Sequence, residues 1–100
     1  MRRREIVFSP EARDDILQIY DWIEERTDPG VALAYVERLE VYCRGFDLAS
    51  ERGRCRDDVR PGLRVVGFER RVTIAFLAEE ERVTILRLFY GGKDWEAVLA

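Results

Sequence analysis

The chain has 100 residues, is 47% hydrophobic and 37% charged, and carries a formal net charge of −3. This balance predicts a single folded domain over residues 1–100 and excludes an intrinsically disordered chain. Histidine is absent, which excludes catalysis or metal binding by imidazole, and two cysteines alone do not make a zinc site. No apolar run approaches the roughly 20 residues of a membrane helix, and no signal-like segment is present, so we expect a cytoplasmic protein without metal or cofactor.

A short strand and a long helix are predicted at the start of the chain. Arg4 to Phe8 alternates apolar side chains, as a strand does. A helix from Pro10 to Arg26 follows, because Ser9 is a good N-cap and proline suits the first helical position. The acidic residues Glu11, Asp14 and Asp15 are expected to complement the positive end of this helix. Its apolar residues form one stripe toward the core, flanked by Leu17 and Trp22; the stripe comprises Ala12, Ile16, Ile19, Tyr20 and Ile23.

A second helix is predicted from Pro29, with Asp28 as its N-cap, to about Leu48. Its apolar positions also recur at helical spacing, so the two helices should pack against each other as an antiparallel hairpin. The segment from Ser50 to Gly62 holds two glycines, a proline and many charges, which predicts a loop.

Three antiparallel strands are predicted next, over Leu63–Phe68, Arg71–Ala78 and Arg82–Tyr90. Strict alternation in the last strand would bury both of its faces. One face would then hold Val83, Ile85 and Phe89, and the other Leu86, Leu88 and Tyr90. Residues 93–100 are expected to form a short tail. The whole pattern predicts an α+β domain of order β-α-α-β-β-β, with a helical hairpin packed on a small, mainly antiparallel sheet.

Charge is distributed unevenly along the chain. Residues 5–40 hold three arginines against ten acidic residues, a balance of −7, whereas residues 41–76 hold eight against five, a balance of +3. Arginine is favoured where planar, bidentate contacts to carboxylate or phosphate are made, although a GC-rich genome would also produce an arginine excess. Because the chain as a whole is acidic, non-specific nucleic-acid binding is not expected. The arginine-rich segment therefore predicts a docking surface, or else a weak nuclease face.

The order of elements and three motifs resemble the ParE/RelE toxin superfamily, and its ParE branch in particular. The motifs are Ser-Pro-Glu-Ala at 9–12, Arg-Asp-Asp-Val-Arg-Pro-Gly-Leu-Arg at 56–64 and Gly-Gly-Lys-Asp at 91–94. The resemblance spans nearly the whole chain and implies a RelE/ParE-like fold. It also implies a toxin that forms a hetero-oligomeric complex with a ParD-like antitoxin. ParE members of the superfamily poison DNA gyrase, whereas RelE members cleave messenger RNA on the ribosome.

The chain departs from the RelE pattern. Ribonucleases of that branch combine a cluster of arginine and lysine with a tyrosine or histidine near the C-terminus. Here Asp94 stands where a catalytic arginine is expected, and residues 96–100 contain no tyrosine or histidine. We therefore predict no catalytic residue and a toxin that acts by binding. The alternatives are a ribonuclease using Arg60, Arg64, Arg87 and Tyr90, and a toxin-fold protein that has lost its activity.

Two sets of contact residues follow from this interpretation, and core packing or internal ion pairing is the alternative for each. The candidate antitoxin-binding residues are Ile19, Trp22, Ile23, Arg60, Arg64 and Arg71. The candidate target-binding residues are Arg56, Arg87, Lys93, Asp94 and Trp95. Electrostatic complementarity would place an acidic antitoxin segment across Arg60, Arg64 and Arg71 and a basic segment against the acidic helical hairpin.

Overall fold

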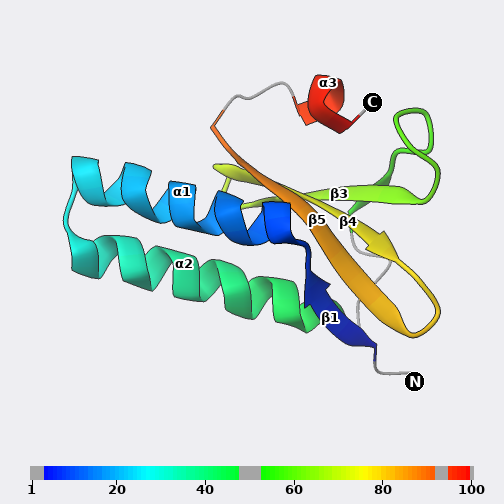
Figure 1. Cartoon of the computed structure of the whole chain (residues 1–100), viewed down its shortest axis with the longest axis horizontal. Coiled ribbons are helices and arrows are strands. Elements are labelled where there is room, and N and C mark those ends of the chain that lie inside the picture. Colours follow the sequence, from blue (N-terminus) through cyan, green and yellow to red (C-terminus); the bar gives the residue numbers. More distant parts are fainter. Residues whose placement is uncertain (1–3, 48–52, 92–94, 100) are drawn as a thin grey trace.

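The structure, a computed structural model of the chain, describes residues 4–47, 53–91 and 95–99 (Figure 1). The elements run in the order β1 (Glu5–Phe8), α1 (Pro10–Arg26), α2 (Pro29–Arg44), the short 3-10 helix η1 (Gly45–Asp47), β2 (Arg54–Cys55), β3 (Leu63–Phe68), β4 (Val72–Ala78), β5 (Arg82–Tyr90) and α3 (Trp95–Leu99). The predicted α+β class and the helical hairpin are confirmed.

The strands form one mixed sheet of five strands in the order β1-β5-β4-β3-β2. The first strand runs parallel to β5, and every other neighbouring pair is antiparallel. Two elements were missed. The segment predicted as a loop holds the two-residue strand β2, and the segment predicted as a tail holds the five-residue helix α3. The α-helical part of the second helix ends at Arg44, and the 3-10 turn η1 follows it.

Local capping explains where the two long helices begin. The Ser9 hydroxyl accepts a hydrogen bond from the backbone N–H of Ala12 at 3.0 Å, and the Asp28 carboxylate accepts one from Val31 at the same distance. Each cap is followed by a proline at the first helical position. A backbone N–H at this position would have no acceptor within the helix, so its absence in proline costs no hydrogen bond. The hydroxyl of Ser9 also donates to the carbonyl of Leu86 at 2.7 Å, so this cap fastens the start of α1 to β5.

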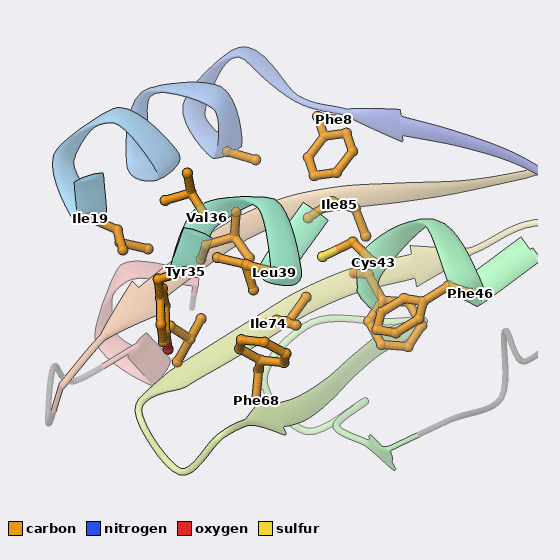
Figure 2. Packing of buried hydrophobic residues seen from close by; sticks show 14 of the residues in the cluster. Phe8, Ile19, Tyr35, Val36, Leu39, Cys43, Phe46, Phe68, Ile74 and Ile85 are labelled. Carbon is orange, nitrogen blue, oxygen red and sulfur yellow. The ribbon is translucent and has the colours of Figure 1, made fainter. Parts of the chain in front are cut away.

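The main core lies between the helical hairpin and one face of the sheet (Figure 2). Phe46, beyond the end of α2, packs on Phe76 of β4 with ring centroids 4.7 Å apart, and both side chains are fully buried. The stripe of α1 contributes Ile19 and Ile23, which are buried in the same core. A second, smaller core on the opposite face of the sheet consists of Leu63, Val65, Ala75 and Phe89, against which Val59, Leu86, Trp95 and Leu99 pack.

A β-bulge in β5 overturns the predicted alternation of that strand. Ala75 pairs with Arg87 and the next residue, Phe76, pairs with Ile85, so Leu86 is an extra residue. The extra residue reverses the faces of everything that follows it. Leu88 therefore joins the main core together with Val83 and Ile85, and Tyr90 packs against that core, whereas Phe89 lies in the second core.

Gly53, which precedes β2, is expected to tolerate no side chain. Its φ is +80°, and a Cβ atom would lie 2.2 Å from the carbonyl oxygen of Val65 on the neighbouring strand. We expect Gly53→Ala to lower the free energy of unfolding by about 1–3 kcal/mol, measured by chemical denaturation. Gly45→Ala is the matched control, because Gly45 has a φ of −72° and no atom within 4 Å of the added methyl. The control should be neutral or stabilising by up to about 1 kcal/mol, and equal losses in both variants would contradict the prediction.

Candidate interaction surfaces

A partly exposed row of aromatic and basic side chains lies where α1 passes the end of β5. We call Arg26, Trp22, Tyr90 and Arg71 the aromatic row. The rings of Trp22 and Tyr90 have centroids 4.5 Å apart, and the Arg26 guanidinium lies 3.8 Å from the Trp22 ring centroid. Arg71 donates a hydrogen bond of 3.4 Å to the Tyr90 hydroxyl. Trp22 remains 39% exposed. Exposed tryptophan, tyrosine and arginine are the residue types that most often anchor protein partners.

A hollow of about 150 Å³ borders the aromatic row, and its lining consists of Asp15, Gln18, Ile19, Trp22, Leu88 and Tyr90. Helix α1 contributes the polar side chains Asp15 and Gln18, and the apolar and aromatic side chains come from both α1 and β5. Such a hollow suits an apolar side chain of a partner rather than a charged ligand.

Ile19 and Ile23, predicted as antitoxin contacts, are buried in the main core. Helical spacing turns both side chains toward the sheet, where they are buried, and leaves Trp22 on the flank of α1. Ile19 lines the hollow beside the aromatic row, whereas Trp22 offers the largest exposed surface of the three residues. Their contacts with an antitoxin stay a prediction.

Arg56 lies on the face of the sheet that carries the second core, opposite the helical hairpin. There it connects α3 with the segment before β3. It makes a bidentate pair with Asp58, with both distances 2.9 Å, and a third contact of 3.0 Å to Glu96. Its guanidinium lies 5.0 Å from the ring centroid of Trp95, and its side chain is only 19% exposed. The hydrogen bonds that Arg56 donates to Asp58, and then the one to Glu96, raise the pKa of Arg56, and the same contact with Arg56 lowers the pKa of Asp58. Arg56 and Trp95 thus hold α3 on the second core.

Arg87 is also paired within the chain. Its Nε and Nη2 atoms donate to the carboxylate of Asp15 at 2.8 and 3.1 Å, which raises the pKa of Arg87. The same carboxylate accepts a hydrogen bond of 2.9 Å from the backbone N–H of Leu88. Asp15 was predicted as a helix-start signal, but it lies beyond the first turn of α1 and is buried against the bulge of β5. The carboxylate satisfies an N–H that no neighbouring strand reaches, because β1 pairs with β5 only as far as Ile85.

Comparison with known proteins identifies the family. A model of the ParE toxin of the type II toxin-antitoxin system, parDE, matches residues 6–95. The chain belongs to the ParE toxin family. Ten chains of solved structures match, among them one titled "Chromosomal ParDE TA system from P. aeruginosa". The two chains are 22% identical in sequence, and their alignment covers 89% of this chain and 97% of the other. They superpose with a TM-score of 0.78, which shows that they share a fold. A search of curated proteins found no significant match.

The remaining arginines of this ParE toxin do not form one surface. Arg60 and Arg64 lie at the end of the sheet where Leu63 pairs with Leu77, whereas Arg71 lies at the opposite end, beside Tyr90. Arg60 is exposed, and Arg64 is half-buried and donates to the Gly53 carbonyl at 3.3 Å. A single acidic segment crossing all three would have to run the length of the strands. Lys93 and Asp94 lie outside the described residues.

Tyr90 and Tyr35 of this ParE chain sit in surroundings that favour packing. Tyr90, a member of the alternative ribonuclease set, lies at the far end of the strands from Arg60 and Arg64 and contacts Trp22 and Tyr35. Burial raises the pKa of Tyr35 to about 12, and its hydroxyl has no hydrogen-bond partner in the described part of the chain. Because the raised pKa keeps the Tyr35 hydroxyl protonated at neutral pH, this side chain is poorly suited to act as a general base.

Two further features bear on the ParE chain as a whole. Across residues 4–47, 53–91 and 95–99, no three histidine, cysteine, aspartate or glutamate side chains are grouped so that they could hold a metal ion. Within the same ranges, every helix falls short of the length and apolar character that crossing a bilayer requires.

Proposed function

We propose that this ParE-family toxin stops bacterial growth by binding DNA gyrase in the cytoplasm, and that a ParD-like antitoxin neutralises it. Its action would then be binding rather than catalysis. The family match over residues 6–95 supports a toxin of a type II toxin-antitoxin system, and the gyrase target and the antitoxin type are our inference from that family.

One observation carries the proposal of a binding mechanism. Arg56 and Arg87 are both bonded to carboxylates of the chain itself, at distances of 2.8 to 3.1 Å. Arginines that stabilise the transition state of phosphoryl transfer must present their N–H groups to the phosphate. Here the planar donor edges of both side chains already face a carboxylate, which suits a structural role.

The two faces of the sheet suggest a division of contacts. The antitoxin would cover the aromatic row on the α1 side. The target would meet the α3 side, where Trp95 is half-buried and a hollow of about 370 Å³ lies between it and the β2-β3 edge. If antitoxin and target bind different faces of the toxin, a substitution on one face should weaken binding of one partner and leave binding of the other unchanged.

Induced expression in a bacterium tests the function directly. We expect arrested growth with filamentation and DNA-damage signalling, and loss of supercoiling activity when the purified chain is added to gyrase. Co-expression of the protein encoded by the neighbouring open reading frame should restore growth. Rapid cleavage of messenger RNA within codons would contradict the proposal and favour a RelE-type ribonuclease, and unimpaired growth would indicate an inactive toxin fold.

A further inference from the structure

The hollow of about 370 Å³ between α3 and the β2-β3 edge has the shape and chemistry of a small-molecule site. We call it the α3 hollow. Its volume falls at the lower end of the range of roughly 300–1,000 Å³ that such sites span. The residues that decide its chemistry are Arg54, Val65, Gly67, Thr73 and Trp95, all of which line it.

Strand register places a bare stretch of sheet at the floor of the α3 hollow. Gly67 pairs directly with Thr73 across β3 and β4, and the alternation that puts Val65 in the second core puts both of them on the same face. Gly67 is exposed and has no side chain, so the backbone of β3 is uncovered at this point. A glycine inside a strand often marks a place where a ligand approaches the backbone closely. A planar group can therefore lie on the sheet here, with Trp95 as a side wall.

Thr73 adds a polar group to this floor. Its side chain is half-buried, and its hydroxyl makes no hydrogen bond within residues 4–47, 53–91 and 95–99. A hydroxyl both donates and accepts hydrogen bonds. It therefore suits the mixed donors and acceptors along the edge of a nucleobase.

The rim of the α3 hollow carries a cation. Arg54 stands opposite Val65 in the register of β2 and β3, so its side chain lies on the same face of the sheet as the hollow. It is exposed and has no carboxylate within 4.0 Å among the described residues. The acidic side chains that hold α3, Asp58 and Glu96, are both bonded to Arg56 instead. The Arg54 guanidinium can thus offer its donors to an oxyanion, for which its planar fork is well suited.

The acidity of the chain as a whole does not oppose an anion at this place. Most of the negative charge belongs to the helical hairpin, which covers the opposite face of the sheet. Exposed charges are screened over about 8 Å at physiological ionic strength, so the field at the α3 hollow depends mainly on its own arginine. The expectation that overall acidity prevents nucleic-acid binding applies to the surface at large, and not to a site of the size of one nucleotide.

We propose that the α3 hollow binds a nucleotide, whose base lies on Gly67 beside Trp95 and whose phosphate pairs with Arg54. The Thr73 hydroxyl bonds to the edge of the base. A nucleotide joins a planar ring to an anion within one small unit, and the hollow joins a flat, bare floor to a guanidinium in the same way. The nucleotide is either one unit of single-stranded DNA or a free nucleotide. This inference goes beyond the proposed function and requires neither gyrase nor an antitoxin.

Filling the α3 hollow tests the inference. The probes are thymidine 5′-monophosphate and a short oligothymidylate, and their binding to the full chain is followed by fluorescence in a Trp22→Phe background, where Trp95 is the remaining tryptophan. We expect saturable quenching of Trp95, and Gly67→Leu should weaken binding of both probes about tenfold or more, because the leucine side chain takes the place of the base. A Cβ atom at Gly67 approaches only the Val72 carbonyl oxygen, at 4.0 Å, so the circular dichroism spectrum should stay unchanged.

Charge reversal at the rim separates the role of the phosphate from that of the base. Arg54→Glu should weaken binding of thymidine 5′-monophosphate about fivefold or more, whereas binding of thymidine, which lacks the phosphate, should stay within about twofold. The matched control is Arg82→Glu at the start of β5. Arg82 is also exposed and has no carboxylate within 4.0 Å in the part of the chain that the structure describes, but it lies outside the hollow. The control should bind every probe as the parent chain does.

The outcomes distinguish the source of the nucleotide and the possible failures. Tighter binding of oligothymidylate than of the mononucleotide would assign the hollow to single-stranded DNA, and equal or tighter binding of the mononucleotide would assign it to a free nucleotide. Absence of saturable quenching, or equal affinities of Gly67→Leu and the parent chain, would overturn the inference. If Gly67→Leu then lost binding to gyrase, the hollow would belong to a side chain of the target protein. These titrations contain neither gyrase nor antitoxin, so their failure leaves the proposed function standing, and a chain that does not arrest growth would overturn the proposed function alone.

Discussion

Asp15→Ala is expected to lower the free energy of unfolding by about 3 kcal/mol. The change removes a carboxylate that is only 8% exposed and that holds both the Arg87 guanidinium and the backbone N–H of Leu88. An unpaired, partly buried guanidinium and an unsatisfied N–H would remain in its place. For a domain of this size the midpoint of thermal unfolding should fall by more than about 10 °C, which calorimetry or circular dichroism measures directly.

The neighbouring residue supplies the control for this prediction. Asp14 is exposed, and Asp14→Ala should change stability by no more than about 0.5 kcal/mol. Asp15→Asn keeps an oxygen acceptor for the Leu88 N–H and should cost less than the alanine variant. A cycle with Arg87→Ala should give a coupling energy of about 1–3 kcal/mol. Additive losses in that cycle would mean that the Asp15 and Arg87 side chains do not stabilise each other.

The elements that the sequence predicted well are those with local signals. Helix α1 begins and ends where predicted, because Ser9 and Pro10 specify its start and the apolar stripe continues without a break to Arg26. Strands β3 and β5 also have their predicted bounds. Each of these signals acts within a few residues of the chain, where the physical rules of capping and alternation apply directly.

The bulge in β5 had no such local signal. The interactions that hold it come from the other end of the chain, since the Ser9 hydroxyl bonds to Leu86 and the Asp15 carboxylate bonds to Leu88, 77 and 73 residues away. Alternation alone assumes an unbroken pairing with β4, and a single extra residue reverses every face after it. For the same reason the sequence placed Leu88 and Phe89 on the wrong faces.

Candidate arginines were hard to separate because their roles depend on distant carboxylates. Arg56 and Arg87 resembled surface cations in the sequence, but their partners Glu96 and Asp15 lie 40 and 72 residues away. Helix α3 is too short for helical periodicity to be recognised, and Trp95 and Glu96 fix it by tertiary contacts.

Trp22→Ala is expected to weaken binding of the antitoxin by at least about 2 kcal/mol, or roughly thirtyfold. The Trp22 ring is held between Arg26 and Tyr90, so it presents a pre-ordered apolar surface that loses little side-chain entropy when a partner covers it. Trp22→Phe keeps an aromatic ring and should retain part of the affinity. The measurement is calorimetric titration of each purified variant with the protein encoded by the neighbouring open reading frame.

Val31→Ala is the matched control, because Val31 is exposed on α2, 48% compared with 39% for Trp22, and lies outside the aromatic row. Its affinity should equal that of the wild-type chain. The loss of the ring contact with Tyr90 should also cost about 1 kcal/mol of stability, so binding is measured where both variants are fully folded. Because the row lies on the α1 side and the target is proposed to bind the α3 side, Trp22→Ala should still arrest growth while resisting neutralisation. A variant that keeps full antitoxin affinity and loses toxicity would instead place the target on the aromatic row and reverse the assignment of the two faces.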